Sequence, residues 1–277
     1  MDFRTTLLAL AKEDPQRRVK TISLAELTSL GARFGTSLPD TARDAVESEV
    51  FPASLLKNTH SLDAVAQKRL LGSTVLLVGV GGLGGYVLEL LVRFGVGRIL
   101  VADGDVFEES NLNRQLVSSI SNLGRNKAVC AAERAGAINP LVRVEALDFF
   151  LDDDNATHFA AEADVVVDAL GGIAPRAAVH AAADAAGKPI ISAAVAGWTA
   201  LVGSERPGVK GISQMWGDAS ARDAEHVLGS LAPAACLCAS LQAAETVQFL
   251  IGGTLQLQGR MLHVDLATFS FQLYDMA

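Results

Sequence analysis

The sequence predicts an α/β fold in which helices cover both faces of a mostly parallel sheet. Short Val-, Ile- and Leu-rich runs alternate with helical patterns from about residue 73 onward, as is typical of strands buried on both faces. The composition is 50% hydrophobic but only 5% aromatic, and small apolar side chains suit close packing of helices on a sheet. The 277 residues are enough for one large core with a small appendage.

Residues 1–70 are predicted to form a small helical N-terminal segment. Ser23-Leu-Ala-Glu26 has the S-x-x-E pattern of a capping box and opens an amphipathic stretch that ends near Gly35. A second helical pattern runs from about Thr41 to Val50. The remainder, 71–277, is predicted to be one nucleotide-binding domain. Whether the first segment is an appendage or an oligomer arm stays open.

The strands and helices alternate in order up to about residue 194. Strands are predicted at Thr74–Val78, Arg98–Ala102, Val142–Leu147, Asp164–Asp168 and Lys188–Ala194, and helices at Gly84–Phe94, Gly124–Ile138 and Pro175–Ala186. Beyond this point an antiparallel C-terminal extension is predicted. It comprises strands at Thr199–Gly203, Met261–Leu266 and Phe269–Tyr274, a polar crossover loop at 204–230, and a buried apolar helix at Ala232–Ile251.

The overall charge and the cysteine count limit the partners and the compartment. A formal net charge of −8 argues against a nucleic-acid partner, because nucleic-acid binders carry a basic patch. Three cysteines are too few for a disulfide framework and fit a reducing compartment. The N-terminus does not have the pattern of a signal peptide, and no apolar segment is expected to reach the roughly 20 residues of a membrane span. We therefore expect a cytoplasmic protein without a membrane partner.

A glycine cluster, G-x-G-G-x-G, joins the first of these strands to the following helix. Its members are Gly79, Gly81, Gly82 and Gly84. Glycines allow a tight turn and a close backbone approach, and the N–H groups and dipole of the helix attract phosphate. Asp103 closes the next strand about 20 residues on, where a carboxylate can bind ribose hydroxyls. The pattern predicts a Rossmann-like nucleotide site and leaves both a nicotinamide dinucleotide and ATP open.

A polar stretch after Asp103 separates these alternatives. The sequence D-G-D-V-F-E-E-S-N-L-N-R-Q carries Asp105, Asn111 and Arg114, and Lys127 follows in G-R-N-K. A dehydrogenase has no need of two cations here. The phosphates of a nucleoside triphosphate carry about four charges, which must be neutralised as the leaving group departs. Arg114 and Lys127 therefore favour ATP over NAD.

At these residues the chain resembles the ThiF/MoeB/HesA adenylyltransferases, bacterial relatives of the ubiquitin-activating enzymes. The resemblance runs from about Leu70 to Pro140, reaches Asp168, and resumes in Ser240–Glu245. It implies a homodimeric enzyme that binds ATP and Mg²⁺. Such an enzyme adenylates the C-terminal Gly-Gly carboxylate of a ubiquitin-like sulfur-carrier protein and releases pyrophosphate.

The resemblance also implies a role for each matching residue. Gly82 would approach the phosphates and Asp103 would bind the ribose. Asn111 and Arg114 would contact the triphosphate, and Lys127 would neutralise its charge. Because the substrate carboxylate is already a nucleophile, catalysis would be alignment and charge neutralisation by Arg114 and Lys127. The rest of the predicted nucleotide site is Gly79, Gly81, Gly84 and Asp105.

Two departures from the family concern the metal ion and the partner subunit. The family carries D-x-x-D-N at the end of one strand, and its second Asp helps to bind Mg²⁺. Here the stretch is Asp168-Ala-Leu-Gly-Gly, so Gly171 and Gly172 stand where Asp and Asn are expected. Asp168 and Asp105 are the candidates to replace the missing carboxylate, and Asp168 is the weaker as a metal ligand because it fits a structural position. The family's Arg-containing motif before the first strand is also absent from Phe51–Leu56.

The cysteines and histidines predict neither zinc nor a thioester. The two C-x-x-C pairs that hold zinc in many members are missing. No Cys lies in the crossover loop, so a thioester there is not expected. Cys130, Cys236 and Cys238 are interpreted as small buried residues. The five histidines show no ligand spacing and are left unassigned: His60, His158, His180, His226 and His263.

Three hypotheses of different classes follow. The leading one is an ATP-dependent adenylyltransferase acting on a sulfur-carrier protein, without a loop thioester. The second is a catalytically silent homologue that binds a nucleotide or a carrier, which Gly171, Gly172 and the missing N-terminal Arg favour. The third, a nicotinamide-dependent enzyme, has only the glycine loop in its support.

Overall fold

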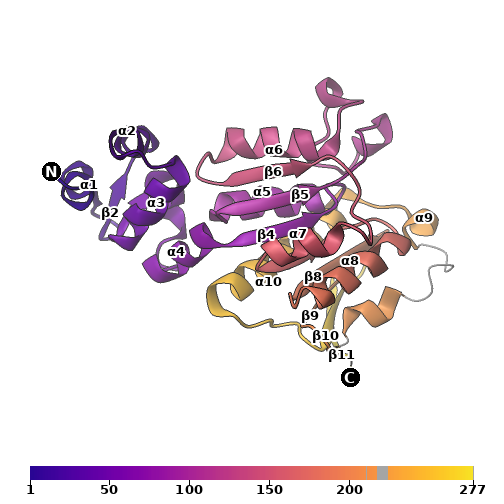
Figure 1. Cartoon of the computed structure of the whole chain (residues 1–277). Helices are drawn as coiled ribbons and strands as arrows, with labels where there is room; N and C mark the ends of the chain where they lie inside the picture. The colour runs from indigo at the N-terminus through magenta and orange to yellow at the C-terminus, as the bar shows by residue number, and fades with distance from the viewer. Residues whose placement is uncertain (210, 217–223, 277) are drawn as a thin grey trace.

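A central eight-stranded sheet organises the molecule, shown in Figure 1 as a computed structural model that describes residues 1–209, 211–216 and 224–276. The strand order is β11-β10-β9-β8-β7-β4-β5-β6. The strands are β4 Thr74–Val78, β5 Arg98–Ala102, β6 Arg143–Leu147, β7 Val165–Asp168, β8 Ile190–Ala196, β9 Thr199–Glu205, β10 Arg260–Asp265 and β11 Ser270–Asp275. Neighbours from β6 to β8 run parallel, and those from β8 to β11 run antiparallel. The predicted fold class and the antiparallel extension are confirmed.

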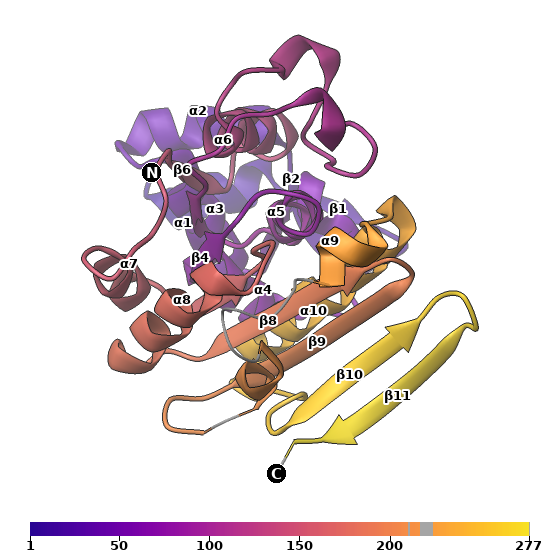
Figure 2. The same cartoon turned by 90° about the vertical axis from the view of Figure 1, so that its right-hand side faces the viewer.

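Helices cover both faces of this sheet (Figure 2). They are α5 Gly84–Phe94, α6 Lys127–Ile138, α7 Ala156–Glu162, α8 Ala174–Ala185 and α10 Ala232–Gly252. α5, α6 and α10 contribute to the main apolar core, whereas α7 and α8 pack on the other face. α6 begins later than the expected Gly124, because the side chain of Asn126 caps it by accepting the Val129 N–H at 3.0 Å.

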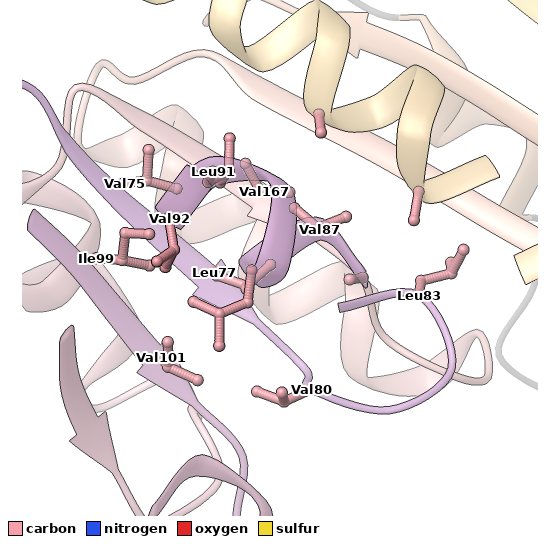
Figure 3. Packing of buried hydrophobic residues seen from close by; sticks show 14 of the residues in the cluster. Val75, Leu77, Val80, Leu83, Val87, Leu91, Val92, Ile99, Val101 and Val167 are labelled. Carbon is pink, nitrogen blue, oxygen red and sulfur yellow. The ribbon is translucent and has the colours of Figure 1, made fainter. Parts of the chain in front are cut away.

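The position of strand β4 in the sheet explains why its sequence is a continuous apolar run. Val75 and Leu77 face α5 and its residues Val87 and Leu91, as Figure 3 shows. The intervening Leu76 belongs to the cluster under α7 and α8. Because successive side chains point to opposite faces and both faces are covered, every position must be apolar.

Helix α10 is long and apolar enough to cross a membrane by length and composition alone, and in this fold it is a core helix that packs against α5, β8 and β9. Gln242 donates its amide to the carbonyl oxygens of Asp168 at 2.7 Å and Ile191 at 2.9 Å. Glu245 accepts the Ser204 hydroxyl at 2.8 Å. These buried polar contacts tie the helix to the sheet.

The N-terminal segment is mixed rather than purely helical, which corrects the expectation. Its helices are α1 Phe3–Leu10, α2 Leu24–Phe34, α3 Leu38–Glu47 and α4 Ala64–Gly72, with a 3-10 helix at Ala53–Asn58. Its strands β1 Lys12–Asp14, β2 Val19–Ile22 and β3 Val50–Pro52 form a separate three-stranded sheet. Three or four residues are too few to show a two-residue alternation, so the sequence pattern does not reveal these strands.

The local signals in this segment are otherwise informative. The capping box is confirmed, since Ser23 Oγ accepts the Glu26 N–H and Glu26 Oε2 accepts the Ser23 N–H at 2.9 Å. α3 starts before the expected Thr41, because Ser37 caps it and Pro39 occupies its first turn, where a missing N–H costs nothing.

The N-terminal core also joins the larger part of the chain. Its cluster of buried side chains includes Leu71 and Leu141. The division into 1–70 and 71–277 therefore stays a prediction.

The crossover region contains short helices. A 3-10 helix spans Ile212–Trp216 and α9 spans Ala224–Leu228. Residues 210 and 217–223 of this predicted loop lie outside the described residues. The Gly197 N–H donates to the carbonyl oxygen of Gly229 at 2.7 Å, which holds the end of α9 against the end of β8.

Candidate nucleotide site

The carboxyl ends of β4, β5 and β7 lie side by side, because β5 and β7 pair in parallel with β4 on opposite sides. The chain leaves β4 toward β5 and later returns to the other side of β4 as β7. Open α/β sheets bind ligands at such a switch in strand order. The loops that follow these three strands carry the residues predicted from the sequence.

Two glycines of the loop are required by the turn itself, and the other two face side chains of a neighbouring segment. Gly79 has φ +89°, and a Cβ there would lie 2.9 Å from the carbonyl oxygen of Ala169. A Cβ on Gly84 would lie 1.8 Å from the carbonyl oxygen of Gly79. The turn itself therefore requires glycine at both positions. At Gly81 and Gly82 a Cβ would meet only side-chain atoms, so these two positions keep the loop backbone open toward a ligand.

The loop leads directly into α5 (Figure 3). The residue that precedes the helix, Leu83, makes no side-chain hydrogen bond to its first turn. Since the first N–H groups of a helix have no intrahelical partner, this uncapped end can receive an anion from outside the chain.

Asp103 connects this loop to the loop after β5. Its carboxylate accepts the N–H of Val80 at 2.8 Å and the N–H of Asp105 at 2.9 Å. Burial raises the pKa of Asp103, and the nearby Lys127 opposes that rise. Each oxygen keeps acceptor capacity for a hydroxyl, so the predicted ribose contact is compatible with the geometry.

Lys127 is the first residue of α6, and its position depends on Asp105. Its ammonium donates to Asp105 Oδ2 at 3.0 Å, and its side chain is only 9% exposed while that of Asp105 is 57% exposed. Asn126 also donates to the carbonyl oxygens of Asp103 at 3.0 Å and Asp105 at 3.2 Å. The predicted lysine thus sits beside the predicted ribose ligand.

Arg114 lies over the glycine loop. A Cβ on Gly82 would be 3.6 Å from Arg114 Cδ. The guanidinium donates to the carbonyl oxygen of Ser110 at 3.2 Å and to Asn113 Oδ1 at 3.0 Å. Its Nη2 lies 3.7 Å from Glu225 Oε1 on α9. The structure thus places Arg114 beside the glycine loop, and its predicted contact with the triphosphate stays a prediction.

Asn111 is buried and serves its own loop in this structure. Its side-chain oxygen accepts the Glu108 N–H at 3.0 Å. It therefore shapes the turn that carries Arg114, and its predicted contact with the triphosphate stays a prediction.

Asp168 does not fit the weak candidacy as a metal ligand that the sequence left open. It is 0% exposed, and its Oδ2 accepts from Arg176 Nη1 at 2.6 Å and from the Ser192 hydroxyl at 2.8 Å. Burial is the largest single effect and raises the pKa of Asp168, but the Arg176 charge, His180 and the Leu170 N–H together outweigh burial and lower it. Arg176 also donates to the carbonyl oxygen of Gly172 at 2.9 Å. Asp168 therefore holds the loop after β7 through Arg176.

The buried His180 belongs to the same network, although its sequence context left it unassigned. Its Nε2 lies 3.3 Å from Asp168 Oδ2, and its Nδ1 lies 3.6 Å from Glu205 Oε2. Burial disfavours the imidazolium, but these two carboxylates outweigh it and raise the pKa of His180 to about 9. Only the tertiary structure reveals this pairing.

Two side chains near the loop were also missed by sequence reasoning. Glu225 reaches Arg114 from α9, as described above. Gln115 is buried, and its Oε1 has no hydrogen-bond partner among the described residues, while its Nε2 lies 3.5 Å from a Cβ built on Gly81. The only available signal was the position of Gln115 directly after Arg114.

Two of the three cysteines are buried, as expected from the sequence. Cys130 and Cys238 are buried, and burial raises the pKa of Cys238 to about 12. Cys236 is exposed, contrary to expectation, because it faces away from the sheet on α10. Within the part of the chain that is described, no three His, Cys, Asp or Glu side chains are grouped to hold a metal. The expected absence of zinc stays a prediction.

Comparison with known proteins agrees with this geometry. A profile of the ThiF family matches residues 55–277. The chain belongs to the ThiF family. It is 30% identical to the molybdopterin-synthase adenylyltransferase of Escherichia coli over 218 residues, which cover 77% of this chain and 87% of that protein. It is 43% identical to the sulfur carrier protein adenylyltransferase of Thermus thermophilus over 129 residues, 47% of this chain. That match covers 48% of the Thermus protein, so the chain spans about half the length of this relative.

Solved structures show that the fold extends beyond close sequence similarity. The crystal structure of E. coli MccB with ATP superposes with a TM-score of 0.64 at 23% identity, covering 77% of this chain and 66% of that one. The glycine loop and its strand, the centre of the predicted nucleotide site, lie within the region matched by the family profile.

Proposed function

We propose that the protein is an ATP-dependent adenylyltransferase that activates the C-terminal Gly-Gly carboxylate of a ubiquitin-like sulfur-carrier protein. The observation that carries the proposal is the convergence of two cations on the glycine loop. Arg114 covers Gly82, and Lys127 lies beside Asp103 and Asp105. This arrangement suits a triphosphate better than a dinucleotide, whose pyrophosphate carries less charge.

The reaction needs little covalent help from the protein. An oxygen of the substrate carboxylate attacks the α-phosphorus, a bond from that phosphorus to the bridging oxygen breaks, and pyrophosphate leaves with the electron pair. The glycine loop and the N-terminus of α5 bind the phosphates. Arg114 and Lys127 stabilise the charge that develops on the leaving group. No thioester in the crossover loop is part of the proposal, because residues 204–230 contain no Cys.

Mg²⁺ is proposed as the companion of ATP. It would neutralise triphosphate charge, and it usually binds through one or two carboxylates together with phosphate oxygens and water. Asp168 cannot serve, because its carboxylate is buried and paired with Arg176. Asp105, the other candidate from the sequence, is 57% exposed and stays the proposed metal-directed carboxylate.

A homodimer is proposed from the family resemblance. The outer strand β11 pairs with β10 on one side, and its Phe271 and Leu273 are exposed. An apolar sheet edge of this kind suits contact with a second copy. Light scattering of the purified protein tests the assembly state.

ATP–pyrophosphate exchange tests the activity. Purified protein with a small carrier protein ending in Gly-Gly should exchange labelled pyrophosphate into ATP. Arg114→Ala and Lys127→Ala should each lower the exchange rate about 100-fold or more, since each removes a charge from the transition state. Arg125→Ala is the matched control, because Arg125 is next but one to Lys127 in the chain and pairs with Glu133 at 2.6 Å on the surface.

The silent homologue is the second candidate, and Gly171 is the specific observation in its favour. This candidate requires that the protein binds ATP but exchanges no labelled pyrophosphate into ATP with any carrier ending in Gly-Gly. Tight NAD binding without affinity for ATP would contradict both candidates.

A further inference from the structure

Phe150 is an exposed aromatic side chain just beyond the carboxyl end of the edge strand β6. The strand ends at Leu147, and Phe150 is 63% exposed. The neighbouring Phe149 is held differently, because its ring packs on Phe159 of α7 with 5.8 Å between the ring centroids. The ring of Phe150 thus presents an apolar face that a ligand can cover.

Gly104, in the loop after β5, provides the seat for this ring. A Cβ built on Gly104 would lie 2.7 Å from Phe150 Cδ2 and 2.8 Å from its Cε2, which is closer than two carbon atoms approach. The φ of Gly104 is not positive, so the backbone alone does not require glycine there. The missing side chain at 104 is therefore what allows the ring of Phe150 to lie against this loop.

The seat directly follows Asp103, the predicted ribose ligand. The carboxylate of Asp103 accepts the Val80 N–H from the glycine loop at 2.8 Å. Its backbone N–H donates to the carbonyl oxygen of Leu147 at 3.1 Å, which ties the end of β5 to the end of β6. The ring of Phe150 thus lies against the residue next to the predicted ribose contact.

The order of the strands indicates where the three parts of a nucleotide would lie. β4, β5 and β6 are successive neighbours in the sheet (Figure 1). The glycine loop after β4 suits the phosphates, and Asp103 after β5 suits the ribose. The base is attached to the ribose on the side away from the phosphates, so it would extend toward the end of β6. Phe150 stands at that end, and an aromatic face is a surface on which bases stack.

We propose that Phe150, seated on Gly104, is the stacking platform for the adenine base of the bound nucleotide. The inference rests on the proposed function, because it assumes that the site binds ATP. The base covers the exposed ring, and the site thereby prefers a nucleotide over a bare polyphosphate. Phe150 acts in binding and does not touch the reacting atoms.

Calorimetric titration of the full chain with ATP and with tripolyphosphate, in the same Mg²⁺ buffer, tests this role. Both ligands use the phosphate-binding residues, whereas only ATP carries a base. Phe150→Ala should raise the Kd for ATP by about tenfold, within the range for loss of one aromatic stacking partner, and leave the Kd for tripolyphosphate unchanged. Phe269→Ala, the loss of the same ring from an 80% exposed position just before β11, should change neither value.

A tryptophan at the same position gives a spectroscopic test. Phe150→Trp keeps an aromatic face, so its Kd for ATP should stay close to that of the wild type. A stacked base should quench the fluorescence of the new tryptophan when ATP is added, and tripolyphosphate should not. The wild type, with its two natural tryptophans, gives the background signal.

The outcomes distinguish the proposed function from the role of Phe150. A wild type that binds no ATP overturns both. ATP binding that Phe150→Ala leaves unchanged overturns the role of Phe150 alone. An equal loss of affinity for ATP and for tripolyphosphate also overturns that role, because the ring would then act through the phosphate-binding loop. Absence of ATP-dependent quenching in a Phe150→Trp variant that binds ATP overturns it as well.

Discussion

A single methyl group separates a required glycine from a tolerant one in the nucleotide loop. In Gly84→Ala the new Cβ would start 1.8 Å from the carbonyl oxygen of Gly79, so the start of α5 must move. We expect the free energy of unfolding to fall by about 3 kcal/mol. In Gly81→Ala the nearest atom is Gln115 Nε2 at 3.5 Å, and the loss should stay below about 1 kcal/mol. Urea unfolding measures the loss of stability in both variants. Equal losses would contradict the distinction between Gly84, which the turn requires, and Gly81, which tolerates a methyl group.

The sequence pattern could suggest candidate site residues that lie close to one another along the chain. Gly82, Asp103, Arg114 and Lys127 belong to such a pattern; in the structure Arg114 lies near Gly82, and Lys127 lies near Asp103 and Asp105. Glu225 could not be found this way, because a lone acid in a polar loop has no spacing to mark it.

The sequence indicated a structural role for Asp168, but its partners could not be found in this way. Its burial and its partners on α8 and β8 arise only when the sheet and helices assemble.

At the scale of elements, a buried charge network links β7, α8 and β9. His180 of α8 lies between Asp168 of β7 and Glu205 of β9. Its pKa is raised from 6.5 to about 9. The stabilisation that charged His180 gives the folded protein is therefore complete below about pH 6.5, and it is lost as the pH rises through about 9. Between pH 7 and 10 the wild type should lose about 2 kcal/mol more stability than His180→Gln. Urea unfolding across this range measures the difference, and parallel pH profiles would contradict it.

One amide makes two of the buried polar contacts between helix α10 and the sheet. In Gln242→Leu the carbonyl oxygens of Asp168 and Ile191 each lose the hydrogen bond from this amide. Because two buried hydrogen bonds are lost, we expect the free energy of unfolding to fall by about 2–3 kcal/mol. Ser240→Ala on the same helix removes an exposed contact to the Cys236 carbonyl oxygen and should change the stability by less than about 0.5 kcal/mol. Thermal unfolding compares the two variants, and similar Tm values would show that the amide is dispensable.

Elements with a long, periodic or continuous apolar pattern were predictable, and short ones were not. β4 and α5 agree with their predicted bounds, because both faces of the sheet impose apolar residues over a full strand. β1, β2 and β3 are three or four residues long. These three strands form because they pair with one another in their own sheet. A local sequence pattern cannot show such pairing.

At the scale of the whole molecule, the N-terminal segment shares its core with the larger part. Leu55, Leu71 and Leu141 are buried in the cluster that also contains Leu7 and Val46. Deletion of residues 1–52 would expose these three leucines to water. We expect a lower Tm and increased binding of a hydrophobic dye by the shortened protein. An unchanged Tm would show that residues 1–52 form an independent domain.

The proximity of positions 171 and 225 has an evolutionary consequence. Two carboxylates in one small space repel each other, and Glu225 Oε2 lies 3.4 Å from a Cβ built at position 171. Aligned family members should therefore seldom carry an acid at the equivalents of both 171 and 225.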